Sequence, residues 1–240
     1  MPHFFINSEN VSDDRISVCD KENYSHIAKS LRARAGEKLV LIDENQIQYE
    51  TLIEKITCDC IEARIEKSYK SVRKLDFELY LAQSPLRNND IVMEKAAELG
   101  VAGVYPLMTD NCAVSFDTVK RKIPRWQKIM YEASKQCERA DIPVCFEPVT
   151  LETLPSLSKG GRGDFTTIAF CERHTELTLR NVPLGKSVLI IVGPEGGFSK
   201  REFEFFDKNN IPMITLGNLI LKAETAVIAG LGNVIYEHTR

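Results

Sequence analysis

The stretch that constrains this chain most lies near its C-terminal end, between Ser187 and Ala226. It starts with an unbroken aliphatic run, Val188–Val192, which is typical of a strand buried on both faces of a sheet. The chain then continues as Gly193-Pro194-Glu195-Gly196-Gly197. The three glycines permit backbone conformations and close approaches that a Cβ atom would prevent. We therefore expect a sharp turn whose backbone a ligand can approach.

A helix should begin directly after this glycine loop. Ser199 and Glu202 have the spacing of a capping box, and Phe198 and Phe203 stand where a hydrophobic staple would. The helix should end near Asn209-Asn210, before the next proline. The local order is thus strand, glycine loop and well-capped helix.

A second glycine-bearing loop follows closely. Met213–Leu216 is expected as a short apolar strand, Gly217–Ile220 as the loop, and Leu221–His238 as the final helix. Two such loops at the C-terminal ends of two strands can form a ligand crevice in an open α/β sheet. Glycines that only make tight turns are the alternative, but two loops so close together favour a binding site.

The middle of the chain alternates between strand and helix patterns. Expected strands are Phe77–Ala82, Val101–Met108 and Thr167–Cys171, and expected helices are Ile91–Leu99 and about Lys120–Glu138. Such alternation predicts an α/β fold with a parallel sheet. The end of the strand Thr167–Cys171 should lie beside the glycine loop. A further glycine-rich stretch, Gly160–Gly163, precedes a strand rather than following one, so we do not expect it to bind a nucleotide.

The first part of the chain has a different, β-rich pattern. Phe4–Ile6, Lys38–Ile42, Gln46–Ile56 and Cys60–Ile65 are expected strands, partly from their alternation. Ser68–Lys74 is polar and basic and indicates a linker. We therefore predict two domains, residues 1–70 and residues 74–240.

The net charge of -3 does not by itself indicate a nucleic-acid partner, so RNA binding would have to rest on local basic patches. One such cluster is His26, Lys29, Arg32 and Arg34. A solvated helix end is the alternative interpretation of these residues.

Compartment and metal chemistry follow from the termini and the cysteines. No apolar run is long enough to span a bilayer, and the N-terminus lacks the apolar segment of a signal peptide. The 7 cysteines include no paired CxxC motif, and Cys58 and Cys60 are too close for an ordinary zinc half-site. We expect these two on one face of a strand, reduced buried thiols throughout, no metal site and a cytoplasmic protein.

Common nucleotide-binding motifs are missing from the sequence. It contains neither G-x-x-x-x-G-K-[ST] nor a strand-linked G-x-G-x-x-G. This argues against nucleoside triphosphatases, Rossmann dehydrogenases and the common Rossmann-like methyltransferases.

The segments GPEGGFSKREFE and LGNLILKAETA together resemble the RsmE family of SPOUT-class methyltransferases. Supporting pieces are EKAAELGVAGVYPL, a Q-x-x-R element at Gln136 and Arg139, and an H-x-x-x-x-L-R element at His26–Arg32. The chain departs from the family pattern at four positions, Asn111, Leu219, Lys222 and Ala223, where arginine, arginine, arginine and threonine are usual.

The resemblance implies an enzyme that methylates N3 of a uridine in 16S ribosomal RNA, using S-adenosylmethionine. It implies a SPOUT-type trefoil-knotted parallel sheet with helices on both faces, an N-terminal PUA-like β-barrel that helps to bind RNA, and a homodimer that shares its sites. The small residues Ala226, Ala229, Gly230 and Asn233 on the final helix are compatible with a dimer seam or with packing inside one chain. On this basis the expected cofactor-binding residues are Cys171, Val192, Gly193, Pro194, Glu195, Gly196, Gly197, Leu216, Gly217, Ile220, Leu221, Thr225 and Ala226.

Uridine N3 carries a proton that must leave before N3 can attack a methyl group. The reaction therefore needs proximity, and a proton acceptor or a group that stabilises the uridine anion. Arg139 is the first candidate for positioning RNA or stabilising charge, and Glu195 and Glu224 are candidates for loop organisation or base work. Each carboxylate could instead satisfy backbone N–H groups at a loop–helix junction. Expected RNA-binding residues are His26, Lys29, Arg32, Arg34, Gln136, Arg139 and Lys222.

Two other functions remain open from the sequence. The departures at Asn111, Leu219, Lys222 and Ala223 would suit a non-catalytic RNA-binding or assembly protein of the same fold. A methyltransferase acting on another RNA, such as a tRNA ribose, is the second alternative. The intact GPEGG and ETA elements favour an enzyme, and the Q-x-x-R element favours the uridine-N3 family.

Overall fold

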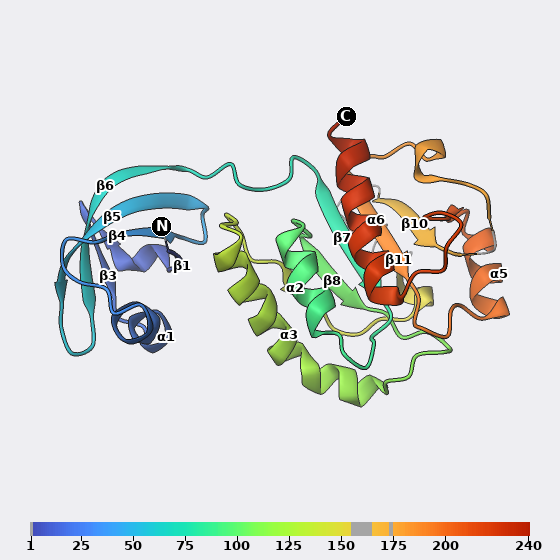
Figure 1. The fold of residues 1–240 in the computed structure, drawn as a ribbon, viewed down its shortest axis with the longest axis horizontal. Coiled ribbons are helices and arrows are strands. Elements are labelled where there is room, and N and C mark those ends of the chain that lie inside the picture. Colours follow the sequence, from blue (N-terminus) through green and yellow to red (C-terminus); the bar gives the residue numbers. More distant parts are fainter. Residues whose placement is uncertain (1, 155–164, 173–174) are drawn as a thin grey trace. The chain divides into compact units, whose positions relative to one another are not determined.

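The computed structural model describes residues 2–154, 165–172 and 175–240, and the stretch Gly160–Gly163 lies outside them. The chain divides into two compact units, one comprising the residues up to Lys74 with Ser134–Asp141, the other Leu75–Ala133 with Ile142–Arg240. Each unit contains one six-stranded sheet (Figure 1). The predicted boundary between residues 70 and 74 remains a prediction. Among the described helices, none is long and apolar enough to cross a membrane.

The N-terminal unit is built mainly from antiparallel strands. Its elements are β1 (His3–Phe5), η1 (Ser8–Asn10), β2 (Val11–Ser12), β3 (Arg15–Val18), α1 (Lys21–Tyr24), the π-helical turn η2 (Ser25–Ser30), β4 (Lys38–Ile42), β5 (Ile47–Ile56) and β6 (Ile61–Lys70). The strand order is β1-β4-β5-β6-β3-β2, and only β1 and β4 pair in parallel. Strand β6 runs to Lys70, so the strand predicted to end at Ile65 is longer and the linker is shorter than the composition suggested.

The core of this unit comes from the alternating inward positions of its strands. Ile16, Leu41 and Ile61 are fully buried there, together with Ile27 from η2. Strand β3 was not predicted, because its four residues follow the polar turn at Asp13-Asp14 and give little alternation to detect. Its pairing with β6 completes the cover over the core.

The cysteines of this unit differ from the expectation. Cys58 and Cys60 lie in the turn between β5 and β6 rather than on one face of a strand, and Cys58 is exposed. Cys60 forms a disulfide with Cys19. The reason is register: Val18, the last residue of β3, pairs with Ile61, the first residue of β6, so Cys19 and Cys60 face each other just beyond the paired strands. The prediction of reduced thiols throughout is therefore wrong for this pair.

The second unit is an α/β structure with a parallel sheet, as the alternation predicted. Its elements are β7 (Glu78–Gln83), α2 (Asp90–Glu98), β8 (Gly103–Pro106), α3 (Phe116–Gln136), β9 (Val144–Cys145), η3 (Leu151–Thr153), β10 (Phe165–Phe170), η4 (Leu179–Asn181), β11 (Ser187–Val192), α5 (Lys200–Lys208), β12 (Met213–Ile214) and α6 (Ala223–His238). The last three residues of α3 belong to the N-terminal unit. The strand order is β12-β10-β11-β7-β8-β9, and all neighbours run parallel.

Helices cover both faces of this sheet. One face packs Leu81, Ile190 and their neighbours against α2, α3 and α6, where Trp126 of α3 is almost fully buried. The other face packs Ala82 and Ile191 against α5 and its aromatic side chains. Strand β11 is buried along its whole length, which explains its unbroken aliphatic sequence.

The end of the chain follows the predicted order with one shifted boundary. Ser199 caps α5, with its hydroxyl accepting from the Glu202 amide and Glu202 accepting from the Ser199 amide, so the predicted capping box is confirmed. The final helix begins at Ala223 rather than at Leu221, because Lys222 has the extended conformation of an N-cap residue. The trefoil knot remains a prediction.

Candidate functional site

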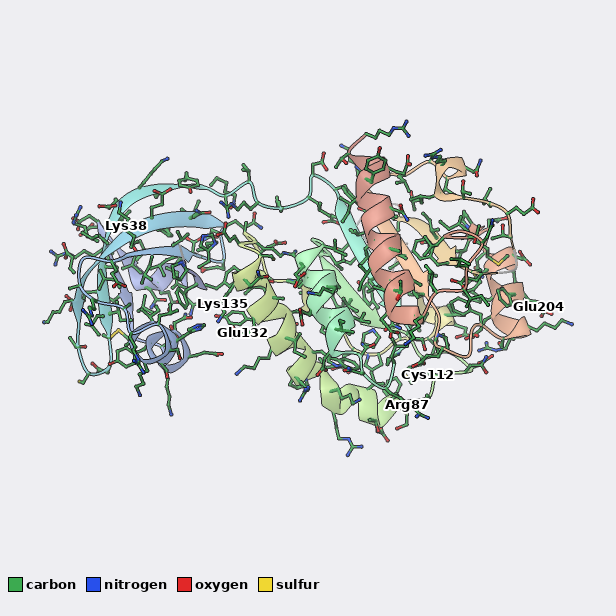
Figure 2. All side chains as sticks on the ribbon, viewed as in Figure 1. Lys38, Arg87, Cys112, Glu132, Lys135 and Glu204 are labelled. Atoms are coloured by element: carbon green, nitrogen blue, oxygen red, sulfur yellow. A yellow bond between two sulfur atoms is a disulfide. The ribbon has the colours of Figure 1, made fainter. Side chains whose placement is uncertain are left out.

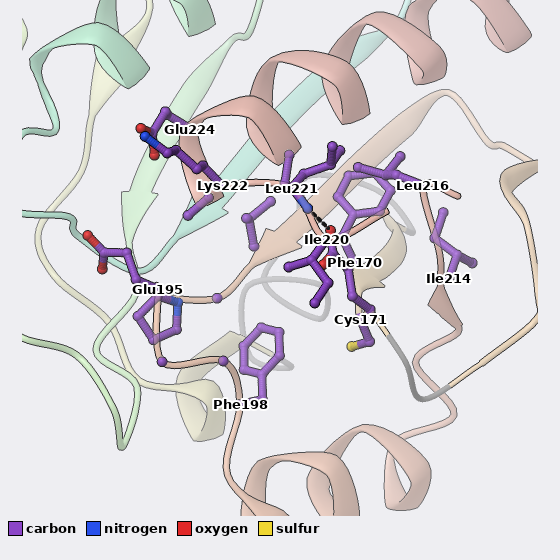
Figure 3. Close-up of a pocket in the computed structure, with 18 of the residues that line it drawn as sticks. Phe170, Cys171, Glu195, Phe198, Ile214, Leu216, Ile220, Leu221, Lys222 and Glu224 are labelled. Carbon is purple, nitrogen blue, oxygen red and sulfur yellow. Dashed lines mark hydrogen bonds between the residues drawn. The ribbon is translucent and has the colours of Figure 1, made fainter. Parts of the chain in front are cut away.

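Three parallel strands, β10, β11 and β12, end at the same edge of the second unit's sheet. The segments that follow them converge around a cavity of about 740 Å³ (Figure 3). The start of α6 closes one side of it. The lining residues are Phe170, Cys171, Glu172, Val192, Gly193, Pro194, Glu195, Gly196, Gly197, Phe198, Phe203, Ile214, Leu216, Ile220, Leu221, Lys222, Ala223, Glu224 and Ala226.

Two glycines of the first loop are required by geometry. A Cβ atom on Gly193 would lie 3.1 Å from the ring of Phe198, so this backbone sits tightly against the aromatic side chain. Gly197 has φ +69°, a left-handed conformation that L side chains rarely adopt. The loop therefore presents bare backbone to the cavity and turns the chain into α5.

An aromatic side chain forms part of the cavity wall and also anchors the last helix. Phe170 ends β10 and is 6% exposed. Its ring lies so close to α6 that a Cβ atom on Gly230 would meet it. Gly230 is thus needed for packing inside one chain, which is the simpler of the two explanations for the small residues of α6. Ala229 and Asn233, by contrast, are partly or fully exposed.

A carboxylate joins two of the loops. Glu172, just beyond β10, accepts a hydrogen bond of 2.8 Å from the backbone N–H of Leu221 (Figure 3). This bond fixes the segment that leads into α6, where the backbone N–H groups have no helical partner. Glu172 was not among the predicted site residues.

The charged side chains of the cavity wall are mainly acidic. Glu172, Glu195 and Glu224 contribute three carboxylates, and Lys222 contributes one ammonium group. Figure 3 labels Glu195, Glu224 and Lys222 at the cavity. Glu195 is exposed, whereas Glu172 and Glu224 are half-buried. The resulting excess of negative charge suits a ligand that carries positive charge.

The glycine loop is held from outside by the segment Thr109–Cys112, which follows β8. The side-chain amide of Asn111 donates to the carbonyl oxygens of Gly197 at 3.0 Å and Gly196 at 3.4 Å. An amide therefore occupies a position where the family pattern has arginine, and it bonds directly to the loop.

Glu202 connects the same segment to α5. Its side chain is fully buried, and its two oxygens accept from the backbone N–H groups of Asp110 at 2.9 Å and Ser199 at 2.7 Å. Arg201 strengthens this connection with hydrogen bonds to both oxygens of Asp110 and with one to Glu152. Its guanidinium lowers the pKa of Asp110, and the Ser199 hydroxyl acts in the same direction.

A buried thiol also lines the cavity. Cys171 is 3% exposed, and burial raises its pKa to about 12. The thiol is therefore neutral at physiological pH and contributes a small apolar surface rather than a nucleophile.

The structure brings most of the predicted cofactor-binding residues together. All of them line the cavity except Gly217 and Thr225. Gly217 lines a neighbouring cavity that shares Glu172 and Ile220, and Thr225 is exposed. Their roles toward a cofactor remain predictions. Lining residues that were not among the predicted site residues are Phe170, Glu172, Phe198, Phe203, Ile214 and Ala223. The position of Glu172 directly after an apolar strand was the available signal for it.

The other predicted residues belong to the N-terminal unit, apart from the half-buried Glu224 and the exposed Lys222, which both line the cavity. Three of these residues are exposed, Lys29 within η2 and Arg32 and Arg34 after it. His26 is half-buried, and its ring lies perpendicular to that of Phe4. Gln136 is exposed at the end of α3.

Arg139, unlike these residues, is buried. It is 6% exposed, and its guanidinium forms an ion pair of 3.1 Å with Asp141. Its predicted role in RNA positioning or charge stabilisation remains a prediction.

Across residues 2–154, 165–172 and 175–240, no group of His, Cys, Asp and Glu side chains is arranged to hold a metal ion.

Comparison with known families gives two matches along the chain. Residues 73–235 match an RNA methyltransferase domain, and residues 19–66 match an RNA methyltransferase PUA domain. Two proteins with the name ribosomal RNA small subunit methyltransferase E illustrate the similarity. The one from Buchnera aphidicola subsp. Schizaphis graminum is 31% identical over 88% of this chain and 86% of its own length. The one from Bacillus subtilis is 24% identical over 90% and 88%.

Solved structures extend the similarity to the fold. A methyltransferase of Legionella pneumophila, in complex with the bound cofactor SAM, is 28% identical with a TM-score of 0.84, covering 98% of this chain and 97% of that one. A ribosomal RNA small subunit methyltransferase E from Neisseria gonorrhoeae superposes with a TM-score of 0.85 at 24% identity, covering 99% and 98%. The latter likeness shows the shared fold.

Proposed function

Since the chain belongs to the RNA methyltransferase family, we propose that it transfers the methyl group of S-adenosylmethionine to N3 of a uridine in 16S ribosomal RNA of the small subunit. The observation that carries this proposal is the cavity where the loops after β10, β11 and β12 converge. A ligand crevice at the carboxyl ends of parallel strands is the usual arrangement in open α/β sheets.

The residues of the cavity fit this cofactor. A volume of about 740 Å³ lies within the range of about 300–1,000 Å³ of small-molecule sites. Backbone N–H and C=O groups of the loop at Gly193–Gly197 can bind an adenine edge, and apolar walls such as Phe170 and Leu216 can cover its ring. The three carboxylates suit the positive charges of the sulfonium and the amino group. The bound cofactor supplies an electrophilic methyl group.

The chemistry left to the protein is to position the uridine and to manage its N3 proton. Glu195 is exposed at the cavity wall and Glu224 lies in the first turn of α6, so either carboxylate can face an incoming base. Glu172 is engaged by the Leu221 amide and therefore serves to hold the loop. Arg139 is proposed to stabilise the uridine anion or to position RNA. Its guanidinium would then contact the RNA in addition to Asp141, with which it forms an ion pair.

The remaining features of the proposal concern RNA binding by the N-terminal unit, the knot, the homodimer and the cellular location. The exposed basic residues Lys29, Arg32 and Arg34 give the N-terminal unit a surface for RNA phosphates. We further propose the trefoil knot of SPOUT proteins, a homodimer through the outer face of α6, and work on ribosomal subunits in the cytoplasm. Tyr236, 61% exposed on that face, is the large apolar side chain a partner would cover.

The function is tested by incubating the purified chain with small ribosomal subunits that lack the modification and with methyl-labelled S-adenosylmethionine. Mass spectrometry of the nucleosides should find N3-methyluridine as the labelled product. Gly193→Val should lose transfer and cofactor affinity, because the new side chain would meet Phe198. Lys208→Gln, at the exposed end of α5, is the matched control. Label in another nucleoside, or in none although calorimetry shows cofactor binding, would reject the proposed reaction.

The shared dimer site is tested by mixing inactive variants. Arg139→Ala and a variant blocked at Gly196 should each be inactive alone, and their heterodimers should recover one intact site. Gly232→Leu or Tyr236→Asp on the outer face of α6 should yield monomers in ultracentrifugation. Gly230 is unsuitable for this purpose, because its replacement would displace Phe170. Full activity from a proven monomer would reject the shared site.

A further inference from the structure

A basic surface outside the predicted RNA-binding residues lies on the first part of α3. Between Phe116 and Ala133 this helix has five basic and two acidic side chains, although the whole chain has a net charge of -3. Arg121 and Arg125 are one turn apart, and Lys122 is three residues from Arg125, so the three lie together on the helix surface.

The loop after β7 extends this surface. Asp90 at the start of α2 forms a hydrogen-bonded ion pair with Arg125, which places the loop beside α3. Arg87 is exposed in that loop, and Figure 2 shows it in the region of the N-terminal half of α3. We call Arg87, Arg121 and Lys122 the α3 basic patch.

The positive charges of this patch are available to bind a negatively charged partner. Arg121 donates to the carbonyl oxygen of Asp117 and to the hydroxyl of Thr118. In the part of the chain that the structure describes, no carboxylate lies within ion-pair distance of Arg87, Arg121 or Lys122. Lys122 instead lies over the ring of the buried Trp126, with 6.0 Å between its ammonium and the ring centroid.

A chain of contacts connects the patch to the cavity. Ser84, which opens the loop with Arg87, donates its N–H to the Val192 carbonyl, directly before the glycine loop. The thiol of Cys112 contacts the carbonyl of Pro85, and its neighbour Asn111 bonds to Gly196 and Gly197. The loop of Arg87, the segment of Asn111 and the glycine loop are thus adjacent along one edge of the sheet.

We infer that the α3 basic patch binds phosphates of the ribosomal RNA that flank the target uridine. The inference rests on the proposed function, because RNA that delivers a base to the cavity must cross the adjacent surface. Guanidinium groups form bidentate contacts with phosphate, and ammonium groups act as point charges. Each phosphate contact releases counterions and adds about 0.7–0.9 to the slope of log affinity against log salt concentration.

The test measures this slope for a fluorescent fragment of small-subunit ribosomal RNA in the absence of cofactor. Arg87→Gln, Arg121→Gln and Lys122→Gln together should make the slope shallower by about two, while calorimetric binding of S-adenosylmethionine stays unchanged. Arg87→Lys with Arg121→Lys keeps both charges and should keep the slope. Lys200→Gln with Lys208→Gln, on the exposed side of α5, is the control for general loss of charge.

Three results would overturn the inference. One is an unchanged slope in the triple glutamine variant, measured when the wild-type chain binds RNA and transfers methyl groups. This result would overturn the inference about the patch and leave the proposed function intact. Another is an equal loss in the α5 control. The third is loss of activity on assembled subunits with an unchanged slope on protein-free RNA, which would assign the patch to a ribosomal protein. If the wild-type chain neither binds RNA nor transfers methyl groups, the proposed function itself is rejected.

Discussion

Glu202 is expected to be the most sensitive polar residue outside the cavity. Its fully buried carboxylate accepts hydrogen bonds from the backbone N–H groups of Ser199 and Asp110. Ser199 is the N-cap of α5, and Asp110 belongs to the segment Thr109–Cys112 that holds the glycine loop. Glu202→Gln keeps the size of the side chain. The amide keeps one acceptor oxygen but places its NH₂ group against the second backbone N–H.

The expected cost follows from these contacts. A hydrogen bond to a charged group contributes about 1.5–3 kcal/mol, and a buried N–H left without a partner costs a similar amount. Because one bond is lost and one donor is left facing another, we expect a destabilisation of about 3 kcal/mol. For a domain of this size that corresponds to a fall in melting temperature of about 6–12 °C.

The matched control is Glu204→Gln on the same helix. Glu204 is 67% exposed and forms only a 3.9 Å ion pair with Lys200, so its replacement should cost less than about 0.5 kcal/mol. Urea unfolding gives the two stabilities, and calorimetry gives the affinity for S-adenosylmethionine. Glu202→Gln should also weaken cofactor binding, since it loosens the segment Thr109–Cys112, whose Asn111 side chain donates to two carbonyl oxygens of the glycine loop. Equal stability of the two variants would refute this reasoning, because the two N–H groups would then be satisfied without the carboxylate.

Three further outcomes are expected. Gly197→Ala should lower cofactor affinity more than stability, because the loop backbone must approach the ligand, whereas the stability cost is limited to about 1–2 kcal/mol for the φ of +69°. Parallel losses in calorimetry and thermal melts would favour a turn-only role. Iodoacetamide at pH 8 should label the exposed Cys58 and spare Cys145, whose pKa burial raises to about 12, and mass spectrometry showing equal labelling would contradict this. Arg201 lowers the pKa of Asp110, so their ion pair stabilises the fold above the unfolded-state pKa and loses this effect as the pH falls through the folded-state pKa. The difference in melting temperature between wild type and Asp110→Asn should therefore be constant above about pH 5 and shrink below it, and a difference that grows toward acid pH would contradict the sign.

The elements that could be predicted from the sequence are those with local signals. The capping box of Ser199 and Glu202 and the aliphatic run of β11 each lie within a few residues, so their physics is contained in short segments. The glycine loop was predicted for the same reason, and its expected place beside the end of β10 is confirmed by the parallel pairing of β10 with β11.

The contacts that could not be predicted join distant segments. Asn111 is 85 residues from Gly196, and nothing in either segment indicates the other. The disulfide of Cys19 and Cys60 depends on the register of β3 against β6, and β3 itself was too short to detect. The second hydrogen bond of Glu202, to Asp110, likewise exists only after the sheet has assembled.

The central claim, methyl transfer to uridine N3 in 16S ribosomal RNA, is tested most directly by mapping modified nucleosides in cells with and without the gene. Mass spectrometry of small-subunit RNA should show a single N3-methyluridine that disappears when the gene is deleted. The wild-type gene should restore it, and a Gly193→Val gene should not. An unchanged set of modified nucleosides after deletion, or loss of a ribose methylation instead, would contradict the account.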